Sequence, residues 1–401
     1  MTVKLFDNNS LLKSCTAKVI SCTEQKGIYN IELDQTVFFP EGGGQLSDRG
    51  TLGESKVLHV SEKDGHIFHE CSAPLEIGTQ VEAILDWNVR LDRMQQHCGE
   101  HILSYACWKL FEANNVGFHM HEDYVSIDVD KELTDEELLQ AEMLTNEIIW
   151  ENRPISVTYM DSTEAVKLKD QMRKYNDKLT GLLRIVTVEN ADVCTCCGTH
   201  PTATGMVGSV KIIRKEKHKT GCRIEFLCGR RALLDADKKN ALLLRIADGF
   251  STKLDNVEAM LAKQDEEINE LHLRIKNMTA KIIEDQLKES IATAPTCKTG
   301  AKLLLLTFTN GDGKEGKQVL PKVTALENTL SLIVTIQPER ISYIAALGPD
   351  TPGNCQQYIK LFNDSFSGRG GGKPDCTQGG SPYCEDWLQK LEEIKEKILA
   401  M

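Results

Sequence analysis

The sequence predicts an α+β protein built from several segments, and three patterns support this fold class. Residues 1 to about 85 alternate apolar and polar positions in short runs between breaks rich in Gly and Asp, which indicates a small β-barrel. From about residue 230 to 290 the chain has no proline and repeats apolar residues at alternating steps of four and three, the heptad pattern of a coiled coil. After Pro295 strand-like runs return and a helix follows, which indicates a separate α/β domain.

These patterns divide the chain into four expected segments. A β-barrel with a glycine motif is expected at 1–88, an α+β domain at 89–229, a helical coiled-coil linker at 230–294 and a C-terminal α/β domain at 295–401. A chain of 401 residues is long enough to bury more than one core.

The second segment is expected to pack helices against a sheet. Apolar residues at helical spacing predict one helix from Asp92 to Asn115. Thr134 is a good N-cap for a second helix that reaches Glu151, because three carboxylates follow it where the helix dipole favours negative charge. Short strand-like runs come next, at 155–159, 183–188, 207–214 and 222–227.

The heptad positions of the third segment run from Phe250 to Ile282 and include one polar residue, Gln264. A buried amide at that position would select the register or the pairing at a cost in stability. The pattern suits two arrangements, which are the pairing of two chains into a homodimer and an antiparallel hairpin within one chain.

Composition narrows the class of protein. The first residues lack the basic and apolar regions of a signal peptide, and no apolar run is long enough to cross a bilayer, so we expect a cytoplasmic protein. In that setting the 14 cysteines should be reduced thiols, with a metal site among them, rather than disulfides. The formal net charge of −12 argues against indiscriminate nucleic-acid binding, so nucleic acid would be held by local basic patches.

Two short motifs carry candidate metal ligands. His97 and His101 lie four residues apart on the first predicted helix, so both imidazoles project from one face, although this spacing alone is a weak signal. The stretch 194–200, CTCCGTH, places thiols and an imidazole in one compact turn. Cys194 and Cys197 are alternatives for the sulfur ligand. The expected tetrahedral zinc set is His97, His101, Cys196 and His200.

Together these motifs resemble the editing domain of alanyl-tRNA synthetase and its freestanding relatives, the AlaX proteins, in which HxxxH is followed about 100 residues later by CxGTH. Three further stretches agree. The resemblance covers nearly the whole chain, and the coiled coil and terminal domain suit the long form of AlaX. The three stretches are the glycine motif at 38–45 with Asp48 and Gly50, the segment Thr204-Gly205 with Gly208 and Lys211, and residues 368–375, GRGGGKPD, which resemble the C-terminal tRNA-binding domain of the synthetase.

The resemblance implies a Zn²⁺-dependent hydrolase that removes serine or glycine from mischarged tRNA(Ala). Such mischarging arises because the amino-acid pocket of a synthetase discriminates poorly between side chains that differ so little. Zinc would lower the pKa of a water molecule or polarise the ester carbonyl. Four protein ligands leave no vacancy in a tetrahedral site, so either the coordination expands or one ligand is loose. Because the glycine motif already begins near residue 38, we expect a chain that edits tRNA without an aminoacylation domain.

Two residues near the expected ligands are catalytic candidates. Glu100 departs from the family pattern, in which a small hydroxyl residue usually precedes the second histidine of HxxxH. A carboxylate there would orient a ligand histidine or accept a proton from water, and its alternative role is that of a solvated helix residue. His119 falls in a region that lines the editing pocket in the family.

The substrate-contact candidates come from the barrel segment. Glycines let a backbone approach a ligand closely, although a tight turn at a barrel edge would use them equally well. Thr36 is a candidate for recognising a serine hydroxyl, and its alternative role is that of a β-branched strand residue. The full set is Thr36, Gly42, Gly43, Gly44 and Gln45.

Two local excesses of positive charge are candidate RNA contacts. Lys211 and Arg214 begin a stretch up to Arg231 in which Lys and Arg outnumber acids, although a solvated strand face would look the same. Arg369 and Lys373 stand among glycines and would follow an RNA backbone closely.

Two other classes of function compete with editing. A non-catalytic RNA-binding protein braced by zinc would not need the complete HxxxH and CxGTH set. A phosphoesterase with a related terminal domain would carry an Asp-His-His sequence, and none occurs here.

Overall fold

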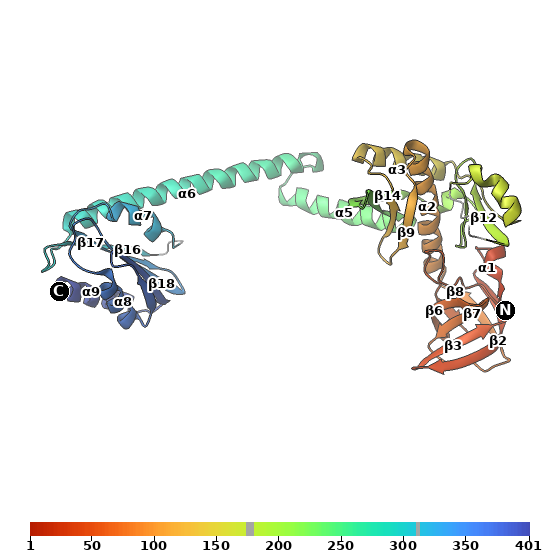
Figure 1. The fold of residues 1–401 in the computed structure, drawn as a ribbon, viewed down its shortest axis with the longest axis horizontal. Coiled ribbons are helices and arrows are strands. Elements are labelled where there is room, and N and C mark those ends of the chain that lie inside the picture. Colours follow the sequence, from red (N-terminus) through yellow and green to blue (C-terminus); the bar gives the residue numbers. More distant parts are fainter. Residues whose placement is uncertain (174–179, 310–312) are drawn as a thin grey trace. The chain divides into compact units, whose positions relative to one another are not determined.

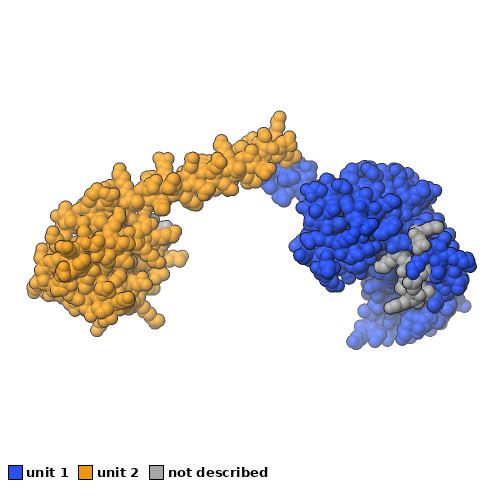
Figure 2. Space-filling view, turned by 45° about the horizontal axis from the view of Figure 1, so that its top comes forward, with its two compact units in different colours: residues 1–246 blue, residues 247–401 orange. Residues whose placement is uncertain are grey.

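The computed structural model describes residues 1–173, 180–309 and 313–401 and forms two compact units, Met1–Ile246 and Ala247–Met401 (Figures 1 and 2). This division is coarser than the four segments expected from the sequence. Both units combine helices with sheets, which confirms the mixed α+β class. None of the helices in the described ranges is both long enough and apolar enough to span a membrane.

The first unit begins with a short parallel pair, β1 (Val3–Lys4) with β4 (Gln35–Thr36), and the helix α1 (Leu5–Asn8) between them in sequence. Six antiparallel strands then close into a barrel, as the alternating pattern predicts. Every second residue of these strands points inward, so Val19, Ile31 and Leu52 are fully or almost fully buried. The barrel strands, in spatial order, are β2 (Ser14–Gln25), β3 (Ile28–Leu33), β7 (His66–Cys71), β6 (Ser55–Lys63), β5 (Gly50–Leu52) and β8 (Gln80–Leu85).

A long helix, α2 (Trp87–Phe111), leaves the barrel directly after β8. The Asp86 side chain caps it by accepting hydrogen bonds from two backbone amides, so the helix begins before the predicted Asp92. It ends at Phe111, because Glu112 adopts the left-handed conformation, rather than at the predicted Asn115. The helix α3 (Asp135–Trp150) follows the predicted Thr134 cap, which forms a complete capping box with Glu137.

Helices α2 and α3 bury one core against a four-stranded antiparallel sheet. A second, three-stranded sheet carries the segment that leads to the CTCCGTH turn. The strands of the first sheet, in order, are β14 (Val210–His218), β15 (Gly221–Cys228), β10 (Val125–Val129) and β9 (Asn115–Met120). The second contains β11 (Ile155–Asp161), β12 (Leu182–Val188) and β13 (Val193–Thr195), and its connections include α4 (Ser162–Ala165), η1 (Val166–Gln171) and η2 (Thr204–Val207).

The predicted coiled-coil segment is two helices, α5 (Gly229–Gly249) and α6 (Val257–Thr293), with the short turn η3 (Leu254–Asn256) before α6. The expected seam therefore begins too early, because Phe250 and Leu254 lie outside both helices and Ser251 takes a left-handed φ of 50°. The seam on α6 itself is exposed, with Leu261 at 45% and Met278 at 56% of their full accessible area.

The second unit continues after α6 into a five-stranded sheet with helices on both faces. Helices α8 (Cys355–Phe366) and α9 (Trp387–Leu399) cover one face, and α7 (Glu315–Val323) covers part of the other together with the end of α6. Strands β16 and β17 are parallel, and the other neighbours are antiparallel. The order is β16 (Lys302–Thr309), β17 (Thr329–Ile336), β18 (Arg340–Leu347), β20 (Cys376–Pro382) and β19 (Arg369–Gly372).

Candidate metal centre

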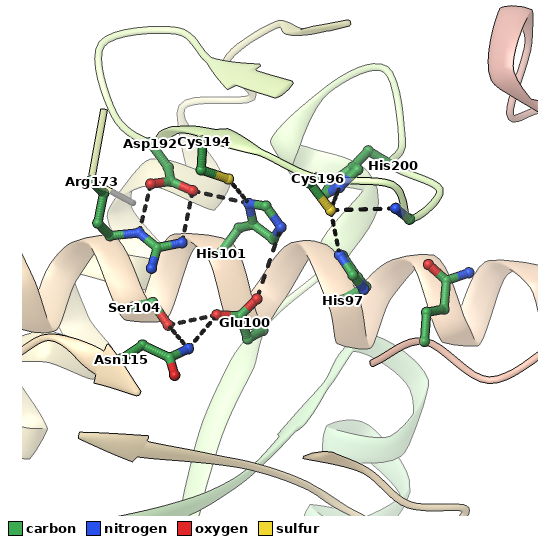
Figure 3. A network of polar contacts seen from close by, with 12 residues as sticks. His97, Glu100, His101, Ser104, Asn115, Arg173, Asp192, Cys194, Cys196 and His200 are labelled. Carbon is green, nitrogen blue, oxygen red and sulfur yellow. Dashed lines mark hydrogen bonds and ion pairs between the residues drawn. The ribbon is translucent and has the colours of Figure 1, made fainter. Parts of the chain in front are cut away.

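Helix α2 presents His97 and His101 from one face, as their spacing predicts (Figure 3). Both side chains are almost fully buried, and their ring centroids are 5.1 Å apart. The helix is packed on the first unit's core along this stretch, so the two imidazoles cannot turn outward into solvent. They meet the turn that follows β13.

That turn supplies a thiol and a third imidazole. Cys196 Sγ lies 3.0 Å from His97 Nε2 and 3.4 Å from His200 Nε2. One ligand atom from each of four residues lies within 4.8 Å of all the others, and the four are His97, His101, Cys196 and His200. The structure therefore brings together the four residues expected from sequence. Among the alternatives, Cys197 is exposed, whereas Cys194 is buried and contacts the opposite side of the His101 ring.

The electrostatics of this cluster suit a divalent cation. Burial acts to raise the pKa of the Cys196 thiol, but the charges of His97 and His101 lower it well below its usual value. Burial, followed by the charge of His101, lowers the pKa of His200 to about 3. A thiolate beside a neutral imidazole is the donor state that zinc requires.

His101 is oriented by a buried carboxylate that the sequence analysis did not identify. Its Nδ1 lies 2.9 Å from Asp192 Oδ2, and Asp192 also receives two bonds from the Arg173 guanidinium, at 2.7 and 3.1 Å. Although burial acts to raise it, the Arg173 charge and the His101 bond hold the pKa of Asp192 well below its usual range. Because Asp192 occupies Nδ1, the Nε2 atom of His101 is the one left for a metal.

The glycine motif supports the ligand turn from the barrel side. Gln45 is fully buried, and its amide accepts a bond from Thr199 N at 3.0 Å and donates one to Thr199 Oγ1 at 2.8 Å. A Cβ on Gly198 would stand 2.7 Å from His97 Cε1, which explains the glycine of CxGTH. Gln45 thus holds the ligand turn in place through Thr199.

Gly44 needs to be glycine for two reasons. Its φ is +81°, and a Cβ there would stand 2.4 Å from the Phe118 ring. Phe118 in turn packs edge-on against His97, with ring centroids 5.4 Å apart. Gly42 and Gln45 close the motif as a tight turn through paired backbone hydrogen bonds.

A buried ion pair between Arg90 and Asp48 ties α2 to the same motif. Both side chains are fully inaccessible, and Arg90 also donates to Val37 O at 2.6 Å and Ser10 O at 2.8 Å. Asp48 accepts a bond from Phe39 N at 2.6 Å. Only Asp48 was visible in the sequence motif, because a lone arginine on a helix carries no signal of burial.

Glu100 is a buried residue of this site and not a solvated helix residue. Only 5% of it is accessible, and its Oε1 accepts bonds from Ser104 Oγ at 2.7 Å and from Asn115 Nδ2 at 2.6 Å (Figure 3). Its other oxygen, Oε2, is 3.9 Å from His101 Nε2. One oxygen is therefore held by neutral donors while the other faces the ligand cluster.

Two candidate residues lie elsewhere. His119 follows Phe118 on β9 and, because strand residues alternate, points to the opposite face, where it lies 3.6 Å from Asp128. Thr36 is fully buried in the barrel, and its hydroxyl is 2.8 Å from His69 Nε2. Thr36 has no surface on which a substrate hydroxyl could rest, so it is better described as a barrel residue.

Several cations of the basic stretch after residue 210 form ion pairs with acids, some on the same strand and some on other elements. Lys211 pairs with Glu142 at 2.7 Å, and Arg214 pairs with Glu216 at 2.5 Å. Glu142 lies on α3, and this pairing is not visible from local sequence. In contrast, Arg369 and Lys373 of the second unit form no ion pair with any residue of the described ranges.

A cleft of about 670 Å³ opens beside the ligand cluster, between the barrel and the three-stranded sheet. Cys196 lies at its wall together with the glycine motif. The residues that define its character are Phe39, Gly42, Gly43, Tyr159, Arg184 and Cys196.

Comparison with known proteins places this site in a family. Residues 183–225 match the threonyl and alanyl tRNA synthetase second additional domain. The alanyl-tRNA editing protein AlaX-L of Pyrococcus horikoshii is 31% identical over 397 residues, which cover 94% of each chain. The alanyl-tRNA editing protein Aarsd1-A of Xenopus laevis is 29% identical, over 93% of this chain and 89% of its own.

A longer relative matches as well. The alanine–tRNA ligase of Pyrococcus furiosus is 27% identical over 99% of this chain, which spans 44% of the ligase. With near full-length coverage of the first relative at 31% identity, and with the HxxxH and CxGTH residues gathered in one buried cluster, the chain belongs to the AlaX family of alanyl-tRNA editing proteins.

Proposed function

We propose that this protein is a Zn²⁺-dependent hydrolase that acts in trans on mischarged tRNA(Ala) and releases serine, glycine or both. The observation that carries the proposal is the buried set of three imidazoles and one thiol beside an open cleft, in a chain whose relatives are named alanyl-tRNA editing proteins. Hydrolysis would split the ester between the amino acid and the terminal ribose.

The donor set fits zinc better than a hard cation. Three nitrogens and one sulfur, with a lowered thiol pKa, suit Zn²⁺, whereas Mg²⁺ and Ca²⁺ prefer oxygen ligands. His97, His101, Cys196 and His200 would hold the ion. When bound, zinc supplies a Lewis acid that polarises the carbonyl or makes a bound water more acidic.

Glu100 is our candidate for moving the proton. Its Oε2 faces the ligand cluster, 3.9 Å from His101 Nε2, while Oε1 is held by Ser104 and Asn115. The carboxylate would accept a proton from the attacking water and return it to the ribose oxygen that leaves, so that water adds across the ester and no net charge is produced.

The cleft is our candidate for the aminoacylated end of the tRNA. Gly42 and Gly43 line it without side chains, so the backbone is accessible there, while the exposed Tyr159 offers aromatic surface to a base. Gln45 would contribute through Thr199 rather than by touching substrate.

Deacylation of Ser-tRNA(Ala) and Gly-tRNA(Ala), measured with and without a chelator, tests the proposal. We expect release of amino acid that stops on chelation and returns with Zn²⁺. A chelated protein that keeps full activity would contradict the metal mechanism. A protein that binds tRNA and zinc but releases no amino acid would support the alternative of a zinc-braced RNA-binding protein.

We infer that the second unit forms a homodimer and also binds tRNA. Apolar seam residues of α6 remain exposed at heptad spacing from Leu261 to Ile282, which suits pairing with α6 of a second copy. Light scattering on the intact chain tests the dimer, because a monomeric mass at micromolar concentration would contradict it. Arg369 and Lys373, which carry unpaired charge, are the RNA contacts that we retain.

A further inference from the structure

Helices cover only part of one face of the second unit's sheet. Helix α7 and the end of α6 pack over β16 and β17, where Leu306 and Ile333 are buried. Toward β18, β20 and β19 the same face is hollowed into a cleft of about 490 Å³. This cleft belongs to the second unit alone and lies outside the metal centre.

The floor of the cleft is polar because of the strand register. Thr335 pairs with Ser342, Ser342 with Gly380, and Gly380 with Arg369, so these residues form one row across four strands. Side chains directly opposite one another in paired strands project from the same face. An apolar helix would find few partners on this row, whereas a ligand with hydroxyls or phosphate would find many.

Glycine leaves room in this row for a guanidinium. A Cβ on Gly380 would stand 3.0 Å from Arg340 Nη2 and 3.1 Å from its Nε, so Arg340 lies over the space that a larger residue would fill. Arg369 is the register partner of that same glycine. Two guanidinium groups thus share one edge of the cleft.

A third cation, Lys317 of α7, lies on the opposite wall. Among residues 1–173, 180–309 and 313–401, no Asp or Glu lines the cleft and none forms an ion pair with any of the three cations. In a chain of formal net charge −12, an uncompensated cluster of three positive charges is unusual. Like charges held together without an acid favour the binding of an anion.

We propose that this cleft binds one phosphate-bearing nucleotide of the tRNA substrate, which rests on the editing function proposed above. Arg340 and Arg369 would hold the phosphate in the forked geometry that guanidinium groups offer, and Lys317 would add charge from across the cleft. Ser342 and Gln378 would hydrogen-bond the ribose or base. A free mononucleotide has the same chemistry and is the other source to be distinguished.

The double variant Arg340→Ala/Arg369→Ala in the full chain tests the proposal. All three cations are exposed at the cleft, so their removal should leave the fold intact, which thermal unfolding checks. We expect affinity for tRNA(Ala) to fall by about tenfold or more, and the slope of log affinity against log salt to drop by about 0.7 to 0.9 for each phosphate that the variant no longer neutralises. The matched control is Lys360→Ala, on α8 and so on the helix layer of the other face.

A second variant tests the same proposal without altering the strands that carry Arg340 and Arg369. Lys317→Ala changes only α7 and should weaken tRNA binding in the same direction. The control Lys360→Ala should keep both the wild-type affinity for tRNA and the wild-type single-turnover deacylation rate. Affinity and salt slope that remain unchanged in both variants would overturn the proposal while leaving the editing function intact.

Titration of the full chain with 5′-AMP and with inorganic phosphate distinguishes the two sources. Competition between 5′-AMP and tRNA that disappears in the double variant supports a site for a nucleotide of the tRNA. If 5′-AMP binds to the wild type but tRNA affinity does not depend on Arg340 or Arg369, the site takes free nucleotide and the tRNA proposal is overturned. The wild type could release no amino acid while the variants still bind tRNA more weakly than the wild type. That result would support the proposed phosphate site and contradict the proposed editing function.

Discussion

The candidate metal centre of the first unit and the cleft of the second unit differ in whether their charged groups are paired. At the metal centre, polar groups are buried and several are fixed by a second residue, as Asp192 fixes His101 and Gln45 fixes the ligand turn. In the cleft, Arg340, Arg369 and Lys317 are exposed and unpaired within the described ranges. Chemistry needs donors that hold their geometry before substrate arrives, whereas capture of a phosphate needs free charge.

The largest effect is expected from removing the sulfur ligand. Cys196→Ala should lower the deacylation rate by about three orders of magnitude, because the ion supplies several kcal/mol of transition-state stabilisation. Metal content, measured by mass spectrometry of the native protein, should fall with activity. Cys197→Ala is the control, since that thiol is exposed. Full zinc content in Cys196→Ala would point to Cys194 as the sulfur ligand.

Breaking the buried Arg90–Asp48 ion pair should destabilise the first unit and leave the cleft of the second unit unchanged. Arg90→Met leaves Asp48 buried without its partner, which costs about 3 to 5 kcal/mol in the free energy of unfolding. Arg49→Met is the control, because its pair with Glu122 is exposed and contributes about 1 kcal/mol or less. Equal denaturation midpoints for the two variants would mean that Arg90 does not hold the glycine motif.

Glu100→Gln separates chemistry from metal binding. The amide keeps the size of the side chain but cannot accept a proton, so the rate should fall by about a hundredfold or more while zinc content stays constant. Glu112→Gln, at the exposed end of the same helix, should change neither quantity. Wild-type turnover at saturating tRNA would return Glu100 to a purely structural role.

The smallest of these effects is expected at the support of His101. Asp192→Asn removes the charge that orients the imidazole and that balances Arg173, so zinc affinity should fall by about 10- to 100-fold in competition with a chelator. Asp128→Asn, which loses a similar arginine pair away from the cluster, is the control. Unchanged affinity in Asp192→Asn would show that the turn positions His101 without this carboxylate.

The regions of the molecule also differ in how much could be predicted from sequence. The four clustered side chains were predictable because HxxxH and CxGTH are short and local, and helix geometry alone places His97 beside His101. His119 was chosen from its region in the family, but the face on which it lies depends on strand alternation, which directs Phe118 toward His97 and His119 toward Asp128. The coiled-coil seam was drawn too long, since heptad spacing does not register the left-handed turn at Ser251.

Local pattern by itself determined the α+β class, the caps at Thr134 and the metal motifs, because each depends on residues within one or two turns of chain. Only the tertiary structure decided which charges are free. Lys211 is neutralised by Glu142 from 69 positions away. Arg340 lies beside Gly380, the register partner of Arg369, and neither arginine forms an ion pair in the described chain. Ion pairing and burial depend on the distance between residues in space, and their separation along the sequence does not determine that distance.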